Sequence, residues 1–150
     1  MGDTRRFEVL ASFISRNFKP CKVADVAGGT GLLSYFLLQY GFTPTVIDPR
    51  NSNLLREFRR YAHKISRIRS EFSSNMAVDF DLIIGLHPDG ATKAICESGK
   101  PCVVVPCCNF WKRGSDIILI VRDYFQRHFH NWFETSLPIN GKNTVFVKKA

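Results

Sequence analysis

The chain has 150 residues, of which 45% are hydrophobic, an ordinary share for a globular domain with a substantial core. Lys and Arg outnumber Asp and Glu by 21 to 13, so the formal net charge is +8 and a polyanionic partner such as RNA is favoured. No apolar run is long enough to span a bilayer, which argues against a membrane-spanning protein.

The compartment is predicted from the N-terminus and the cysteines. The chain begins M-G-D-T-R-R-F-E, a charged stretch that lacks the apolar core of a signal peptide. The five cysteines are odd in number and unevenly spaced, unlike the framework of a secreted disulfide-rich domain. We therefore expect a single domain over residues 1–150 in a reducing, cytoplasmic compartment.

A helix is expected to open the chain. Its apolar face has helical spacing and comprises Phe7, Leu10, Ala11, Ile14 and Phe18. Asp3 or Thr4 is expected to cap the start of this helix. Pro20 is expected to stop it before a strand that begins near Lys22.

A strand, a glycine turn and a helix follow in that order. Residues 23–31 read V-A-D-V-A-G-G-T-G, and the apolar residues between this turn and Gly41 have helical spacing. Glycines let backbone N–H groups approach a ligand closely, and the start of a helix adds free N–H groups. The next strand, 43–48, ends in Asp48, where a carboxylate can accept both hydroxyls of a ribose in open α/β sheets.

The glycine spacing indicates which nucleoside is bound. It does not match the G-x-G-x-x-G of dinucleotide sites, because the third glycine is missing. The stretch D-V-A-G-G-T-G instead resembles motif I of the class I S-adenosylmethionine-dependent methyltransferases, in the version found in quinone-biosynthesis enzymes. The resemblance implies that the methionine part of S-adenosylmethionine is bound by Asp25, Ala27, Gly28, Gly29 and Gly31. It also implies that Asp48 binds the ribose and that Pro49 lies near the adenine.

Residues 51–70 are predicted to form a helix and then the third strand. Asn51 or Ser52 is expected to cap the helix. Its inward face is expected to comprise Leu54, Leu55, Phe58, Tyr61, Ala62 and Ile65. The other face and the strand at 65–70 carry a basic run of Arg56, Arg59, Arg60, Lys64, Arg67 and Arg69. We interpret the run as a surface for RNA phosphates, which would give affinity rather than sequence choice; a merely solvated helix face is the alternative.

The remaining chain continues the alternation of strand and helix. Strands are expected at 80–86, 100–105, 132–137 and 144–148. A short helix is expected at 91–97, and a longer one is capped by Ser115 and keeps its apolar spacing as far as Trp132. The pattern predicts an α/β fold: a seven-stranded, mostly parallel Rossmann-like methyltransferase sheet with helices on both faces and a C-terminal antiparallel hairpin.

Two polar clusters follow the fourth and fifth predicted strands. They read G-L-H-P-D-G-A-T and V-P-C-C-N-F, and together they resemble a branch of methyltransferase-like proteins that includes tRNA-modifying enzymes. Ligands of such sheets bind beyond the carboxyl ends of the strands. The expected acceptor-site residues are therefore His87, Asp89, Cys107, Cys108 and Asn109. His87 and Asp89 could accept a proton or orient the acceptor, although His87 could also be a structural cap of its turn.

The adjacent cysteines leave three interpretations open. A thiolate of Cys107 or Cys108 could add to C6 of a pyrimidine and activate C5 for methylation, as pyrimidine C5 methyltransferases do. Both thiols could instead be small apolar fillers of a tight turn. A metal site is the third possibility, but these residues and Cys102 lack the C-x-x-C pairs of a zinc site, so no metal is expected.

Methyl transfer from a sulfonium is an in-line displacement, in which a protein mainly aligns donor and acceptor. The residues above favour an S-adenosylmethionine-dependent methyltransferase that acts on RNA, with tRNA favoured. Three alternatives stay open: a small-molecule methyltransferase, a non-catalytic protein of the same fold that is the partner of a larger enzyme, and a nucleotide-dependent oxidoreductase.

Overall fold

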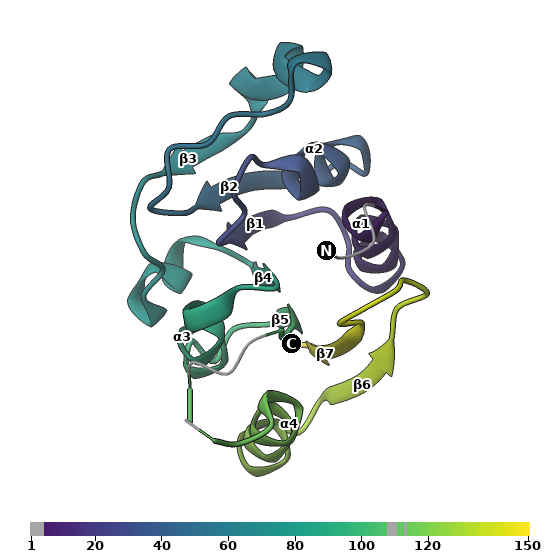
Figure 1. Ribbon diagram of the computed structural model, residues 1–150, viewed down its shortest axis with the longest axis vertical. Coiled ribbons are helices and arrows are strands. Elements are labelled where there is room, and N and C mark those ends of the chain that lie inside the picture. Colours follow the sequence, from purple (N-terminus) through teal and green to yellow (C-terminus); the bar gives the residue numbers. More distant parts are fainter. Residues whose placement is uncertain (1–4, 108–110, 113) are drawn as a thin grey trace.

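The computed structural model describes residues 5–107, 111–112 and 114–150. Its centre is a seven-stranded sheet with the order β3-β2-β1-β4-β5-β7-β6 (Figure 1). The strands are β1 (Lys22–Val26), β2 (Thr43–Ile47), β3 (Ser66–Ile68), β4 (Leu82–Leu86), β5 (Cys102–Val105), β6 (Trp132–Ser136) and β7 (Thr144–Lys148).

The direction of the strands confirms the predicted fold class. The five strands from β1 to β5 are parallel, and β7 runs antiparallel to both β5 and β6. The chain order reverses between β1 and β4, which are neighbours in the sheet. In an open α/β sheet, ligands bind in the crevice at the carboxyl ends of the strands beside such a reversal.

Helices cover both faces of the sheet (Figure 1). The α-helices are α1 (Arg6–Asn17), α2 (Leu32–Gln39), α3 (Thr92–Glu97) and α4 (Ile117–His128), and the 3₁₀ helices are η1 (Arg56–Lys64), η2 (Ser74–Asp79) and η3 (Asp89–Ala91). Because side chains alternate along a strand, Val23 packs in the core beneath α1 and α2, whereas Ala24 packs in the core beneath α3 and α4. Within the described residues, no helix is both long and apolar enough to cross a membrane.

The helix ends agree only in part with the sequence predictions. Gly41 ends α2 in the left-handed region at a φ of 89°, as expected for a residue just past a helix. Helix α4 is capped by Asp116 rather than Ser115, because the Asp116 carboxylate accepts a hydrogen bond from the N–H of Ile118. Helix α1 begins after Arg5, and the predicted caps Asp3 and Thr4 lie outside the described residues.

One predicted helix is too long and another has the wrong form. Helical spacing was expected as far as Trp132, but α4 ends at His128 and Phe129 is already extended; Trp132 instead begins β6, in agreement with the strand expected at 132–137. The predicted amphipathic α-helix after β2 is instead the 3₁₀ helix η1, which buries none of its residues. A 3₁₀ helix has about three residues per turn, so Phe58 and Tyr61 lie on one side and both contact Tyr35, with ring centroids at 4.5 and 5.2 Å.

Candidate cofactor and acceptor site

The glycine turn joins β1 to α2 at the reversal of strand order. Ala27, Gly29 and Gly31 have φ angles of 56°, 57° and 94°, all in the left-handed region. Glycine adopts this region freely, whereas an alanine there costs about 1–2 kcal/mol, so the departure from glycine at Ala27 has a local cost. The turn is closed by a hydrogen bond of 3.0 Å from the N–H of Gly31 to the carbonyl of Gly28.

Asp25 lies directly beneath this turn and is 1% exposed. Its Oδ2 accepts a hydrogen bond of 2.7 Å from the hydroxyl of Ser34, which joins β1 to α2. A Cβ on Gly28 would lie 2.6 Å from the carboxyl carbon of Asp25, so only glycine fits above this carboxyl group. Burial raises the pKa of Asp25 to about 6, against the lowering effect of the Ser34 hydrogen bond. Asp25 therefore supports the turn from below.

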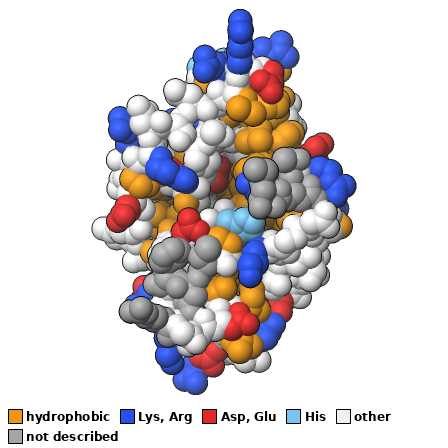
Figure 2. Space-filling model, viewed as in Figure 1, with side chains coloured by type: hydrophobic (Ala, Val, Ile, Leu, Met, Phe, Trp, Pro, Cys, Tyr) orange, Lys and Arg blue, Asp and Glu red, His pale blue; other side chains and the backbone are white. Residues whose placement is uncertain are grey.

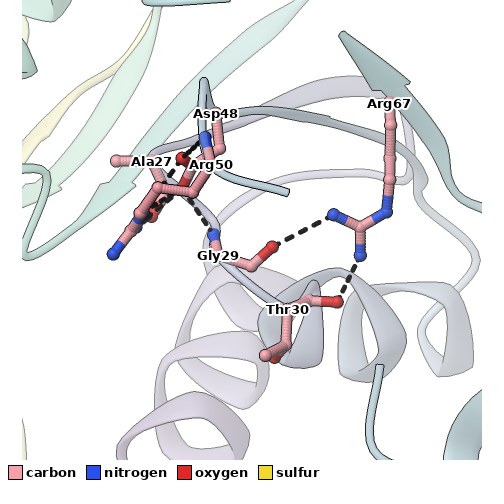
Figure 3. A network of polar contacts seen from close by, with 6 residues as sticks. All are labelled: Ala27, Gly29, Thr30, Asp48, Arg50 and Arg67. Carbon is pink, nitrogen blue, oxygen red and sulfur yellow. Dashed lines mark hydrogen bonds and ion pairs between the residues drawn. The ribbon is translucent and has the colours of Figure 1, made fainter. Parts of the chain in front are cut away.

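Asp48 follows β2 and is bound by its own chain (Figure 3). Its carboxylate accepts hydrogen bonds from the N–H of Gly29 at 2.9 Å and from the N–H of Arg50 at 2.8 Å. The guanidinium of Arg50 adds bonds from Nε to Oδ1 at 3.0 Å and from Nη2 to Oδ2 at 2.7 Å. Burial raises the pKa of Asp48, but these hydrogen bonds outweigh it and lower the pKa to about 2. A carboxylate has about four acceptor positions, and these donors use them all.

Arg67 holds the other side of the glycine turn (Figure 3). It extends from β3, and its guanidinium donates to the carbonyl of Gly29 at 3.0 Å and to the carbonyl of Thr30. The glycine turn is thus held between Asp48 of one strand end and Arg67 of the next strand. Arg67 belongs to the basic run that was predicted to bind RNA phosphates, and its contact with the glycine turn has no signal in the sequence.

A cleft of about 370 Å³ opens beside Asp48. Residues from the ends of β1, β2 and β4 line it together with residues that follow β3: Val26, Ala27, Ile47, Asp48, Pro49, Arg50, Glu71, Phe72, Pro88, Asp89, Gly90 and Ala91. The mixture of apolar walls and a few carboxylates is typical of small-molecule sites. Four of these residues, Ala27, Asp48, Pro49 and Asp89, were predicted site residues, whereas Glu71 and Phe72 were not.

The predicted acceptor-site residues are brought together in part. The thiol of Cys107 donates to Oδ1 of Asp89 at 3.1 Å, so the ends of β4 and β5 meet at this pair. His87 lines neither this cleft nor the second cleft described below. Its Nε2 lies 3.0 Å from the carbonyl oxygen of Lys142, in the connection between β6 and β7, so His87 ties this connection to the turn after β4. The predictions for Cys108 and Asn109 lie outside the described residues.

Two further cysteines, Cys96 and Cys102, belong to the core. Cys96 and Cys102 are buried, and burial raises the pKa of both thiols, that of Cys102 to about 12. A protonated thiol is a poor nucleophile and a poor metal ligand. In the part of the chain that the structure describes, no group of three or more His, Cys, Asp or Glu residues could hold a metal ion.

The basic run continues on η1, away from the glycine turn. Figure 2 shows Lys and Arg side chains gathered at the end of the molecule where Figure 1 draws η1. Arg56, Arg59, Arg60 and Lys64 are exposed there, with Glu57 as the one acidic residue of this helix. The guanidinium of Arg60 lies over the ring of Tyr61, 4.9 Å from its centroid.

Comparison with known proteins identifies the fold. No protein-family model matches the chain, and no curated protein matches it in sequence. The 1,6-didemethyltoxoflavin-N1-methyltransferase of Burkholderia thailandensis, solved with S-adenosylhomocysteine, is 12% identical with a TM-score of 0.63, covering 98% of this chain and 80% of that one. The tRNA methyltransferase TrmK of B. subtilis is 17% identical with a TM-score of 0.62, covering 97% of this chain and 64% of that one. The ribosomal protein L11 methylase of Lactobacillus delbrueckii subsp. bulgaricus is 16% identical with a TM-score of 0.60, covering 98% of this chain and 79% of that one.

The fold is that of the Rossmann-like S-adenosylmethionine-dependent methyltransferases. The names of these three proteins indicate different methyl acceptors: a small molecule, a ribosomal protein and a tRNA. At these low identities a shared fold does not identify the methyl acceptor of this chain.

Proposed function

We propose that this protein is an S-adenosylmethionine-dependent methyltransferase whose acceptor is RNA, with tRNA favoured. The observation that supports the cofactor most directly is the hydrogen bond of 2.9 Å between the N–H of Gly29 and the carboxylate of Asp48. It joins the glycine turn after β1 to the acid after β2, at the edge where the strand order reverses. A nucleoside with a charged tail needs both parts within reach of one cleft.

The cleft and the glycine turn beside it fit this cofactor. Ala27, Gly28, Gly29 and Gly31 would surround the methionine part above Asp25, and Asp48 would accept the ribose hydroxyls once the Arg50 guanidinium moves aside. Pro49 and Phe72 offer apolar surface to an adenine, and the carboxylate of Glu71 can accept from its amino group. The bound cofactor would supply an electrophilic methyl group on a sulfonium.

We propose Asp89 as the residue that accepts a proton from the methyl acceptor. It lines the cleft, and the thiol of Cys107 holds one oxygen of its carboxylate. The other oxygen can accept the proton that an N–H or O–H acceptor loses on methylation. Because the Cys107 thiol donates to this carboxylate, its role in the proposal is to orient Asp89. Cys108 and Asn109 stay proposed acceptor-site residues by resemblance to the tRNA-modifying branch, whereas the contact of His87 with Lys142 favours its alternative role as a structural cap of the turn after β4.

The exposed basic run on η1 supports RNA as the acceptor. Arg56, Arg59, Arg60 and Lys64 gather on one projecting element, and Tyr61 adds an aromatic ring. Arginines bind phosphates, and aromatic rings stack on unpaired bases, so the element offers both kinds of RNA contact.

The test is methyl transfer from labelled S-adenosylmethionine to an unmodified RNA pool, compared with a pool of small metabolites. We expect label in the RNA fraction, and Asp89→Asn is expected to reduce it at least tenfold if a proton must be accepted. Asp123→Asn, which removes a carboxylate from α4, is the matched control. Label found only in small molecules would exclude RNA as the acceptor.

One observation favours a second candidate, a non-catalytic protein of this fold that is the partner of a larger enzyme. The acceptor positions of Asp48 are filled by Gly29 and Arg50 of its own chain. If this arrangement is permanent, S-adenosylhomocysteine will neither bind nor raise the melting temperature. A rise in melting temperature with this ligand would exclude the second candidate.

A further inference from the structure

A second cleft, of about 310 Å³, opens on the other side of Asp48 from the first. It lies between the end of β2, the strand β3 and segment 51–53, which belongs to no helix or strand. Its polar lining comprises Asp48, Arg50, Asn51, Ser52, Arg67 and Arg69, with Asn53 beside them. Asp48 and Arg50 line both clefts and so form the wall between them.

The charge of this second cleft is strongly positive. Three arginines line it, and its single carboxylate, Asp48, is already bound by Arg50 and Gly29. The guanidinium of Arg67 bonds two backbone carbonyls, which leave its charge unneutralised. Arg69 is exposed and has no hydrogen-bond or ion-pair partner among the residues that the structure describes. An excess of guanidinium groups around a hollow attracts an anion.

The segment 51–53 supplies hydrogen-bond donors that are not used inside the protein. Within the described ranges, none of Asn51, Ser52 and Asn53 makes a hydrogen bond through its backbone N–H or its side chain. These residues carry three successive N–H groups, two side-chain amides and a hydroxyl, and all three line the same hollow as the arginines. Neutral donors of this kind, set beside arginines, are the groups that bind phosphate oxygens.

We propose that the second cleft binds a phosphate group, through Arg69, Arg50 and the donors of segment 51–53. The proposal deepens the proposed function, because the shared wall puts this phosphate next to the ribose end of the cofactor cleft. The phosphate can come from an RNA backbone or from a free nucleotide, and the arms of the test separate the two sources.

The test uses the whole protein, labelled with ¹⁵N, and inorganic phosphate titrated at constant ionic strength. We expect the amide signals of segment 51–53 and of Arg69 to move with phosphate and not with chloride. Arg69→Ala is expected to weaken phosphate binding about tenfold, since a hydrogen bond to a charged group contributes about 1.4 kcal/mol or more. Arg69 is the residue to change, because replacing Arg67 would also release the glycine turn.

Arg127→Ala is the matched control. It removes one exposed arginine from α4, at the opposite end of the molecule from β3 (Figure 1). Unmoved signals in segment 51–53, or equal weakening by Arg69→Ala and Arg127→Ala, would overturn the proposal.

A short oligoribonucleotide and adenosine monophosphate are then titrated separately into the protein, and their binding is followed through the same amide signals. Tighter binding of the oligonucleotide assigns the phosphate to RNA, and tighter binding of the mononucleotide assigns it to a free nucleotide. Calorimetry of the same wild-type protein with S-adenosylhomocysteine keeps the two proposals apart. If the protein binds phosphate but not S-adenosylhomocysteine, the proposed function is contradicted and the phosphate site is still supported.

Discussion

The guanidinium of Arg50 covers the carboxylate of Asp48, with Nη2 at 2.7 Å from Oδ2 and Nε at 3.0 Å from Oδ1. The side chain of Asp48 is 2% exposed, whereas that of Arg50 is 64% exposed. The acid is therefore fixed in place, and the arginine is free to rotate toward solvent. A ribose that binds Asp48 must compete with Arg50 for the same acceptor positions.

Replacing Arg50 by alanine is expected to tighten the binding of S-adenosylhomocysteine, because the competing guanidinium is lost. An ion pair whose arginine is exposed contributes up to about 1 kcal/mol, so the expected gain in affinity is about twofold to fivefold. Isothermal titration calorimetry measures it, with Arg127→Ala as the control for the loss of one positive charge. Weaker binding by Arg50→Ala would mean that Arg50 contacts the ligand instead of competing with it.

The sheet could be predicted from the sequence because its signals are local. The apolar run of β4 and the glycine turn before α2 specify their elements without help from distant residues. Arg50, Glu71 and Phe72 could not be assigned to the site, because a single polar or aromatic residue after a strand has no periodic pattern. Helix η1 was predicted with the wrong period, because residues three apart, such as Phe58 and Tyr61, share one face in an α-helix and in a 3₁₀ helix alike.

Gly28→Ala is expected to destabilise the protein and to disturb the turn. The new Cβ would lie 2.6 Å from the carboxyl carbon of Asp25, which is buried and cannot move toward solvent. Overpacking of this kind lowers the free energy of unfolding by about 1–3 kcal/mol. Urea denaturation of the variant and the wild type measures the difference. Gly99→Ala is the control, because nothing lies within 4 Å of its new Cβ and only its φ of +71° is strained. Equal losses in both variants would show that contact with Asp25 has no special cost.

The pH dependence of stability is expected to reveal Asp25. Its pKa is about 6 in the folded protein, against 3.8 for an ordinary Asp, so the folded state holds a proton that the unfolded state has lost. The Asp25 contribution therefore weakens as the pH rises from about 4 to about 6, by up to roughly 3 kcal/mol. Asp48 has the opposite sign: its pKa of about 2 means that its contribution is lost as the pH falls below about 4.

The variant Asp25→Asn isolates the first of these effects. An amide carries no charge to bury, so the variant should gain stability relative to the wild type between pH 4 and pH 7. Urea denaturation at several pH values within this range measures the difference. A constant difference between variant and wild type across the range would mean that Asp25 does not titrate there.

Charge reversal at Arg56, Arg59 and Arg60 is expected to weaken RNA binding and to flatten its salt dependence. All three residues are exposed on η1, where none of the residues is buried. Each lost phosphate contact lowers the slope of log affinity against log salt by roughly one. Anisotropy with a labelled RNA measures affinity and slope together, and reversal of Lys93, Lys100 and Arg127 controls for net charge. If the slope of log affinity against log salt is unchanged, the basic run on η1 is a solvated surface that does not contact RNA.

Calorimetric titration of S-adenosylhomocysteine into the wild-type protein and into Asp48→Ala tests the cofactor site most directly. We predict measurable binding by the wild type and an affinity at least about tenfold lower in Asp48→Ala, because the buried carboxylate that we propose to accept the ribose hydroxyls is lost. Asp123→Ala, which removes an exposed carboxylate from α4, should bind like the wild type. The assignment of this cleft to the methyl donor would be contradicted if the wild type gives no heat of binding, or if Asp48→Ala binds with the same affinity as the wild type.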